Sequence, residues 1–183
     1  MENKSIKFMF EDENLFIESL DGQVTLFNSR EIFKGGVDID LERLGLNYPE
    51  KSTAETFFDI CDVAGTNYFL DTFLSVTTDL NGAVLTQNQI TRFCEKYPDY
   101  LSREKAGTFF LTKNDKGYFV INVTMHSYMM IRGVDNEYSL IDVDIDIAVG
   151  KFGLSPTVRA IGSSFPKEHI LRVVIPRLIS NNL

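Results

Sequence analysis

Several residue types are scarce in this 183-residue sequence, which has no tryptophan, two histidines and two cysteines. Two cysteines cannot make the disulfide framework of a small secreted protein, so we expect Cys61 and Cys94 to be reduced and buried. No run of about 20 apolar residues is present, and the first residues lack the apolar core of a signal peptide. We therefore expect a soluble, cytoplasmic protein that does not cross a membrane.

Basic residues are also few, because 18 lysines and arginines stand against 26 acidic residues and the net charge is −8. The acidic excess is confined to the first half of the chain. Residues 1–85 hold 16 acidic and 6 basic residues, whereas residues 86–183 hold 10 and 12. Binding to a phosphate backbone requires clustered lysine and arginine. The composition therefore disfavours direct nucleic-acid binding and suits a cationic protein partner.

The remaining composition is that of an ordinary globular protein, 44% hydrophobic and 24% charged. The length predicts a single domain over residues 1–183. A chain of this size buries roughly 70% of its unfolded surface, so it needs no disulfide or metal to be stable. Fifteen phenylalanines indicate a core built largely from aromatic rings.

The most informative stretch is 85–125. Thr86 and Gln89 have the spacing of a capping box, in which the two side chains satisfy free amides at a helix start. The apolar residues behind this cap are spaced as one stripe of a helix over residues 86–97, and Pro98 follows it. They are Ile90, Phe93, Cys94 and Tyr97. Next, residues 108–112 and 118–125 read as two strands of a hairpin, joined by a turn at 114–117.

Strands are also predicted near both ends of the chain. In the first half, residues 6–10, 15–18 and 24–27 read as short strands, with Asp21-Gly22 as a turn. In the second half, residues 139–149 alternate strictly between apolar and polar, and residues 170–175 form a last apolar run. A period of two over this length is typical of a half-buried strand.

A second capping-box spacing, Ser52 and Glu55, precedes apolar residues at helical intervals, including Phe57, Phe58 and Cys61. We read residues 52–75 as helical, with Gly65 as a break. The elements together predict an α+β fold. A mostly antiparallel β-sheet would come from the C-terminal half, packed by two or three helices that include 52–75 and 86–97.

Seven short segments between Leu20 and Pro176 follow one another in a distinctive order. They are Leu-Asp-Gly at 20–22, Phe-Lys-Gly-Gly-Val-Asp-Ile-Asp at 33–40, Leu-Gly-Leu at 44–46, Leu-Thr-Gln at 85–87 with Ile90 and Phe93, Gly-Thr-Phe-Phe-Leu at 107–111, Tyr-Phe-Val at 118–120, and Arg-Val-Val-Ile-Pro at 172–176. This order resembles a widespread group of small uncharacterised proteins encoded by bacteria, phages and mobile elements. The group has no assigned activity. The resemblance therefore implies one compact domain and a mobile-element origin, and it carries over no catalytic residue.

The strongest candidate for chemistry is the row Asp142, Asp144 and Asp146 on the predicted strand 139–149. Successive carboxylates on one strand face lie ~7 Å apart. A divalent cation needs oxygens at roughly 2.0–2.6 Å, so one ion would bridge at most two of them and would need other ligands. We favour a solvated strand face and keep a metal site as the alternative.

Other chemistries have weaker support. Cys94 lies on the apolar stripe of its helix and Cys61 lies mid-helix in our reading, whereas reactive thiols occupy accessible, electropositive sites. No stretch matches a Walker phosphate loop or a dinucleotide-binding fingerprint. The aromatic pairs Phe109-Phe110 and Tyr118-Phe119 lack the basic groove that a single-strand binder places beside its rings.

We therefore expect a non-enzymatic protein-interaction or accessory factor of phage or mobile-element type, without a cofactor. It would be an acidic inhibitor of a cationic, nucleic-acid-handling partner whose identity the sequence leaves open. The alternatives are a metal-dependent enzyme of unknown class that uses the aspartate row, or a small structural or assembly protein, and the oligomeric state stays open. The predicted partner-binding residues are the acids of the first half. They are Glu11, Asp12, Glu13, Glu18, Asp38, Asp40 and Glu42.

Overall fold

The structure is a computed structural model that describes residues 5–9, 14–34, 36–37, 40–64, 69–103, 107–131, 138–151 and 170–177. At residues 5, 36, 40, 69–70, 126–131 and 138–151 it describes the backbone only. The described strands are β1 (Ser5–Met9), β2 (Leu15–Ile17), β3 (Gly36–Val37), β4 (Thr56–Ala64), β5 (Thr108–Asn114), β6 (Gly117–Ile131), β7 (Tyr138–Lys151) and β8 (Leu171–Pro176). The helices are α1 (Asp40–Arg43), α2 (Phe69–Val76) and α3 (Gln87–Lys96), with 3₁₀ turns η1 (Leu80–Ala83) and η2 (Pro98–Tyr100).

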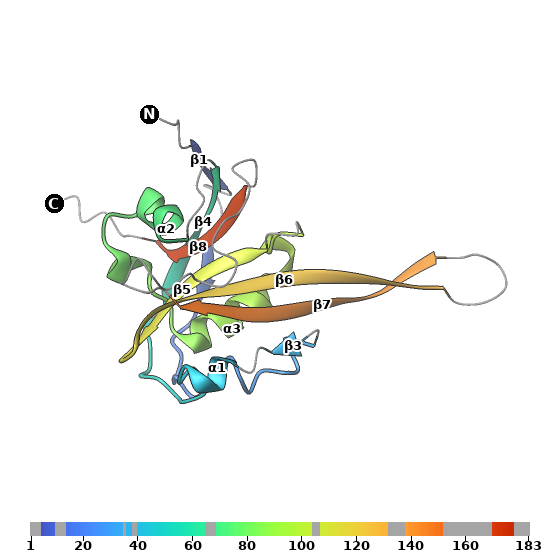
Figure 1. Cartoon of the computed structure of the whole chain (residues 1–183), viewed down its shortest axis with the longest axis horizontal. Helices are drawn as coiled ribbons and strands as arrows, with labels where there is room; N and C mark the ends of the chain where they lie inside the picture. The colour runs from blue at the N-terminus through green and yellow to red at the C-terminus, as the bar shows by residue number, and fades with distance from the viewer. Residues whose placement is uncertain are drawn as a thin grey trace.

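The eight described strands form one sheet in the order β1-β4-β8-β5-β6-β7-β3, and β2 pairs with β4 beside β1 (Figure 1). Most neighbouring strands are antiparallel, and the parallel pairs are β5 with β8 and β3 with β7. The predicted α+β class, a mostly antiparallel sheet with two or three helices, is confirmed. No helix in the described part of the chain is long and apolar enough to span a bilayer.

The central strands of the sheet are buried on both faces. On one face, α3 and the N-terminal loops cover a core that includes Phe58, Phe93 and Phe110. On the other face, α2 and η1 cover a smaller core that includes Cys61 and Phe73. In Figure 1 the two helices lie on opposite sides of the central strands. Burial of aromatic and aliphatic side chains on both faces is the main source of stability for this arrangement.

Helix α3 forms as the sequence predicts. Thr86 is the N-cap, its hydroxyl accepts a hydrogen bond from the Gln89 amide at 3.3 Å, and the Gln89 side chain accepts one from the Thr86 amide at 2.9 Å. The capping box is therefore confirmed. The Gln89 side-chain amide also donates to the Thr56 hydroxyl at 2.8 Å, which ties the helix start to β4.

The helix predicted over 52–75 is wrong in its first part, because residues 56–64 are strand β4 and only α2 is helical. Phe58 and Ile60 of β4 face the α3 side, while Cys61 and Val63 face the α2 side. A strand buried on both faces reads as a continuous apolar run, and such a run fits a helical spacing by accident. The aromatic and β-branched content of the segment was the signal for a strand. Cys61 accordingly lies on a strand and not on a helix.

The predicted strand at 24–27 is also wrong. These residues lead into a turn in which the Ser29 amide donates to the Leu26 carbonyl at 3.3 Å and the Ser29 hydroxyl donates to the Thr25 carbonyl at 2.7 Å. The Leu26 amide donates instead to the Gln87 side chain of α3 at 3.3 Å. Side-chain partners thus replace the strand partners that the alternation of apolar residues suggested.

The predicted hairpin after Gly107 is confirmed, and its second strand is longer than predicted. Strand β5 pairs with β6 only as far as Val123, and β3 pairs with β7 at Asp146 and Ile147. Residues 125–131 of β6 and 138–145 of β7 pair only with each other among the described strands, with a register shift after Tyr128. Figure 1 shows this two-stranded ribbon running away from the rest of the sheet.

Candidate functional site

Strand β2 is fastened to α3 through main-chain atoms of Phe16. The Tyr97 hydroxyl accepts a hydrogen bond from the Phe16 amide at 3.0 Å and donates one to the Phe16 carbonyl at 2.8 Å. The Lys96 ammonium donates to the same carbonyl at 3.0 Å and lies 4.2 Å from the centre of the Phe16 ring. The end of α3 therefore holds β2 at a fixed distance from the helix.

The segment after β2 is fastened at its other side. Leu20 and Thr53 exchange two main-chain hydrogen bonds of 3.0 and 2.9 Å, and the Glu50 amide donates to the Gly22 carbonyl at 2.9 Å. Gly22 has a φ of 77°, and a Cβ atom there would lie 2.2 Å from the Glu50 carbonyl oxygen. Only glycine fits this close approach, so the path of residues 20–22 is set by the main chain itself.

Two adjoining hollows lie between α3 and these segments, and we call them together the α3 groove. The larger has a volume of about 470 Å³ and is lined by residues 19–21, 24 and 31–32 and by Asn88, Thr91, Arg92 and Glu95 of the helix. The smaller, of about 250 Å³, is lined by residues 17–18 and by Arg92, Glu95 and Lys96. Arg92 and Glu95 belong to both, so the groove follows one side of the helix.

One side of α3 supplies the groove. Asn88, Thr91, Arg92 and Glu95 are spaced at i, i+3, i+4 and i+7, the same intervals as the apolar stripe. The sequence analysis used the apolar stripe and missed this polar one. Its signal was the pair Asn88 and Thr91, two uncharged polar residues that follow the same spacing as the charged residues Arg92 and Glu95.

The floor of the groove consists of buried polar side chains. Asn88 is 2% exposed and Thr91 is 0% exposed. The Asn88 amide nitrogen donates to Asp21 Oδ1 at 3.3 Å, but Asn88 Oδ1 and Thr91 Oγ1 have no hydrogen-bond partner among the described residues. A buried polar atom without a partner costs roughly 1–3 kcal/mol. Both oxygens have less than 1 Å² of accessible surface, so they lie beneath the surface of the groove and do not face a ligand in it.

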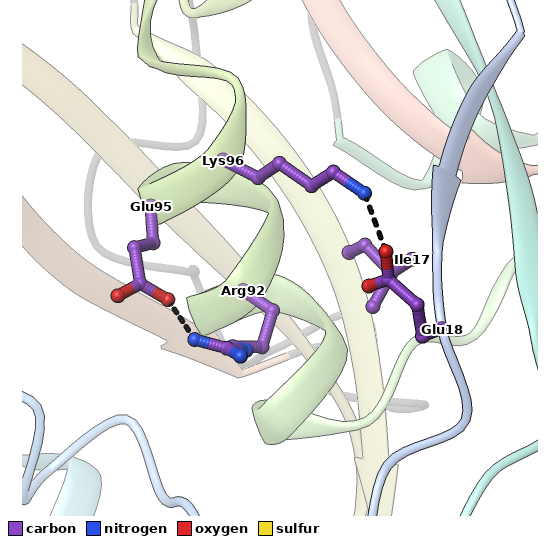
Figure 2. Close-up of a pocket in the computed structure, with 5 residues that line it drawn as sticks. All are labelled: Ile17, Glu18, Arg92, Glu95 and Lys96. Carbon is purple, nitrogen blue, oxygen red and sulfur yellow. Dashed lines mark hydrogen bonds and ion pairs between the residues drawn. The ribbon is translucent and has the colours of Figure 1, made fainter.

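The rim of the groove carries charges of both signs, and Figure 2 shows two ion pairs on it. Arg92 pairs with Glu95 on the same helix, and Lys96 reaches across to Glu18 at 2.9 Å. The hydrogen bond between Lys96 and Glu18 lowers the pKa of Glu18 and raises the pKa of Lys96. Both bases at the rim are thus already paired, which leaves the carboxylates of Asp21 and Glu31 without a cationic partner among the described residues.

A carboxylate outside the groove supports the start of α3. Glu50 Oε2 accepts a hydrogen bond from the Gln87 amide at 2.6 Å. Burial raises the pKa of Glu50, and the hydrogen bond from the Gln87 amide opposes that effect only in part. This carboxyl group satisfies a free amide at the start of α3 and lines neither hollow, so we assign it a structural role.

The predicted partner-binding acids are only partly within the described residues. Glu18 lies at the rim of the α3 groove, and Glu42 is exposed on α1. The backbone of Asp40 begins α1, and its side chain lies outside the described residues. Glu11, Asp12, Glu13 and Asp38 also lie outside them. The groove contributes three acids that the sequence analysis did not name, Asp21, Glu31 and Glu95.

The other candidate residues are also only partly within the described part of the structure. Asp142, Asp144 and Asp146 stand on β7 in register with Tyr128, His126 and Thr124, and their side chains lie outside the described residues. Within the described side chains, no group of three or more His, Cys, Asp or Glu is placed to hold a metal ion. Cys61 and Cys94 are free and buried as predicted. Burial raises the pKa of Cys61 to about 12 and raises that of Cys94 further.

Comparison of the chain with protein-family models, with curated proteins and with solved structures found no match.

Proposed function

We propose that the protein is a non-enzymatic interaction protein, an accessory factor of phage or mobile-element type, that holds a cationic segment of a protein partner in the α3 groove. The charge of the groove supports this proposal. Four acids, Glu18, Asp21, Glu31 and Glu95, line it against two bases, Arg92 and Lys96. Each base is paired with a glutamate, Arg92 with Glu95 and Lys96 with Glu18. The carboxylates of Asp21 and Glu31 therefore remain to attract a cationic ligand.

The acidic first half of the chain adds to this field. Residues 1–85 hold 16 acidic residues against 6 basic ones, and Glu11, Asp12, Glu13, Asp38, Asp40 and Glu42 are among the acids. Charge of one sign steers the encounter with an oppositely charged partner and is weakened by salt. A partner of this charge includes the enzymes that handle nucleic acids, since they carry clustered lysine and arginine. Binding of the α3 groove to the lysines and arginines of such an enzyme would inhibit it.

The test is affinity capture from a lysate of the producing cells, with identification and quantification by mass spectrometry at several salt concentrations. The variant removes three groove charges, Asp21→Asn, Glu31→Gln and Glu95→Gln. The matched control removes three exposed charges elsewhere, Glu55→Gln, Asp99→Asn and Asp115→Asn. We expect a basic partner to be captured by the native protein and by the control, and to be lost from the groove variant and at high salt.

Two results would refute this function. One is capture that is equal for the groove variant and the control at every salt concentration. The other is a captured partner whose contact surface is acidic or uncharged. In either case the groove charges serve solubility alone.

A second candidate function is that of a structural or assembly component, and the β6–β7 ribbon favours it. A two-stranded ribbon without further strands is marginally stable in water. The pairing of residues 125–131 with residues 138–145 would therefore be stabilised by contact with a neighbouring molecule. Light scattering would measure the molar mass of the native protein. A variant in which residues 127–142 are replaced by a short Asn-Gly turn should be monomeric if the ribbon makes an assembly contact.

A further inference from the structure

We infer that the open edge of β6 in the β6–β7 ribbon, residues 125–131, pairs with the same edge of a second copy of this chain. The two β6 strands run antiparallel about a two-fold axis and make one four-stranded sheet in the order β7-β6-β6-β7. This contact gives the second candidate function, on which the inference rests, a defined partner and a defined edge. It is independent of the α3 groove.

The main-chain groups of β6 are open beyond the point where β5 ends. The Val123 carbonyl oxygen lies on the β5 side of β6, since it is 2.8 Å from the position of a Cβ atom on Gly107. Main-chain groups alternate between the two edges of a strand, so those of Met125, Ser127 and Met129 face the same side. Strand β5 pairs with β6 only as far as Val123, and no other described strand takes its place. This edge therefore offers a row of unpaired donors and acceptors.

The two strands of the ribbon differ in the features that keep an edge from pairing. Charged residues, prolines and bulges on an edge strand hinder its pairing with another chain. Residues 125–131 read Met-His-Ser-Tyr-Met-Met-Ile, without an acidic residue, a lysine, an arginine or a proline. Strand β7 carries the aspartate row, and the register shift after Tyr128 leaves Ile141 unpaired, which places the bulge on β7. The β7 edge is thus protected against pairing and the β6 edge is not.

The β6 edge is complementary to itself, which favours a second copy as its partner. A two-fold axis at Tyr128 sets Ser127 of one chain opposite Met129 of the other, and Met125 opposite Ile131. All four of these residues have main-chain groups on the open edge, so they form the hydrogen-bonded pairs of the new ladder. This register uses the whole stretch that β5 leaves free, and no two charges of one sign stand opposite each other in it.

The charge of the ribbon also favours pairing through β6. Two β7 edges would bring the aspartate rows of both copies onto neighbouring strands, where like charges are destabilising. With the two β6 strands in the centre, the rows lie three strand spacings apart, ~14 Å at ~4.8 Å for each spacing. That distance exceeds the Debye length of ~8 Å at physiological salt, so the repulsion between the rows is largely screened.

The position of the ribbon leaves room for this contact. Figure 1 shows the ribbon extending beyond the other described elements, so a second molecule reaches the β6 edge without displacing any of them. A pair of strands alone is marginally stable in water, and three or more strands are needed for a stable sheet. Pairing of two copies doubles the strands at this place from two to four, which stabilises both ribbons.

The first test measures the molar mass of the full-length protein by sedimentation equilibrium over a range of concentrations. We expect twice the mass of one chain. Ser127→Pro removes an N–H group that faces the open edge of β6 and should give the mass of one chain. The matched control is Val143→Pro, at the position opposite Ser127 in the ribbon, where the lost N–H group faces the outer edge of β7. The control should remain a dimer.

The second test locates the two-fold axis. Residues of a non-hydrogen-bonded antiparallel pair have Cα atoms roughly 4.5 Å apart, within the range that a disulfide spans. Tyr128→Cys stands opposite its own copy at the axis and should give a disulfide-linked dimer with oxidised glutathione. The control is Met130→Cys, whose two copies stand four residues apart along the strands, ~14 Å at ~3.4 Å per residue, and should stay unlinked. The native cysteines are buried and common to both variants.

Three results would overturn the pairing of two β6 edges. One is the mass of a single chain at every concentration, which would reserve the edge for a strand of another protein. Another is a mass that keeps growing with concentration, which indicates a head-to-tail contact of β6 with β7. The third is a disulfide in Met130→Cys and none in Tyr128→Cys. If both proline variants are monomeric, the disulfide test decides, because it leaves every main-chain hydrogen bond in place.

The replacement of residues 127–142 by a short turn separates this inference from the function on which it rests. If that replacement is monomeric while Ser127→Pro stays a dimer, the ribbon makes an assembly contact through another edge, and the pairing of β6 edges is wrong. If the replacement also stays a dimer, the assembly role of the ribbon is wrong as well.

Discussion

The hydroxyl group of Tyr97 makes both main-chain hydrogen bonds of Phe16, at 3.0 Å to its amide and 2.8 Å to its carbonyl. Phe16 stands opposite Phe57 in the pairing of β2 with β4. Because its amide and carbonyl bond to Tyr97, the two residues form a non-hydrogen-bonded pair of that ladder. A single side chain thus takes the place of a neighbouring strand. It also holds the end of β2 beside the helix, where Ile17 and Glu18 line the smaller hollow of the α3 groove.

Replacement of Tyr97 by phenylalanine should therefore destabilise the protein. The ring remains packed against Phe93, at 5.4 Å between centroids, but both hydrogen bonds between Tyr97 and Phe16 are lost. The Phe16 amide is then left without a partner, while the carbonyl keeps the Lys96 ammonium. We expect a loss of about 1–3 kcal/mol in the free energy of unfolding, measured by urea denaturation. The Phe16 amide should also exchange faster with solvent. The control is Tyr118→Phe, which loses only exposed hydrogen bonds, one to Asn81 and one from Lys113, and should change stability by less than about 0.5 kcal/mol.

A second prediction concerns the capping box of Thr86 and Gln89. Thr86→Ala removes the hydroxyl acceptor at the start of α3 and should cost about 1 kcal/mol in the free energy of unfolding. Thr78→Ala, at an exposed bend nearby, removes the same group from a site without a helix cap and should have little effect. Equal effects of the two changes in chemical denaturation would show that the cap does not stabilise the helix.

Glu50 predicts a dependence of stability on pH. Its folded-state pKa is raised above the ordinary value of 4.5, so its protonated form is favoured by folding. A raised pKa means that the contribution of this group is fully present below the unfolded pKa and is lost as the pH rises through the folded value. Glu50→Gln keeps an acceptor for the Gln87 amide without the charge. We expect the difference in unfolding free energy between native protein and variant to shift in favour of the variant as the pH rises from about 4, where carboxyl groups titrate.

Glu18→Gln is the counterpart for that experiment. The pKa of Glu18 is lowered by Lys96, so its contribution is present above the unfolded pKa and is lost as the pH falls through the folded value. The two variants should therefore change the pH profile in opposite directions. Profiles that run parallel would contradict the assigned causes of both pKa shifts.

Gly22 predicts strong sensitivity to a single methyl group. Gly22→Ala would place a Cβ atom 2.2 Å from the Glu50 carbonyl oxygen at a positive φ. We expect the free energy of unfolding to fall by more than about 1–3 kcal/mol. The strain of the dihedral angle and the clash with the main chain both contribute to this loss. Gly117 also has a positive φ, of 124°, but open space around it. Thermal melting of Gly117→Ala therefore measures the dihedral strain alone, and it should be the milder change.

The two thiols should resist labelling in the native state. Cys61 and Cys94 are buried, and burial raises the pKa of both, so little thiolate exists at neutral pH. A thiol reagent should react slowly with native protein and rapidly after unfolding in denaturant. Fast reaction of either cysteine in native protein would revive the possibility of a nucleophile.

The sequence predicted the elements whose signals are local. The cap at Thr86, the stripe behind it and the turn before Gly117 each depend on residues within one or two turns of chain. Strand β4 was misread because burial on both faces removes the alternation that marks a strand. The α3 groove was missed because its walls come from residues 17–32 and 88–96, which sequence spacing does not bring together. Sequence spacing does show the polar stripe from Asn88 to Glu95, which forms one wall of the groove.

The position of β8 in the sheet has a consequence for how the chain reaches its native state. It is the last described strand in sequence, yet it lies between β4 and β5. Without it, the described strands fall into two sets that share no strand pairing, one around β4 and one from β5 to β3. During synthesis, β4 and β5 leave the ribosome before β8 and carry apolar edges without their shared neighbour, a state prone to aggregation. The insertion of β8 between β4 and β5 is therefore a late step of folding. A chain truncated before Leu171 leaves the facing edges of β4 and β5 permanently unpaired.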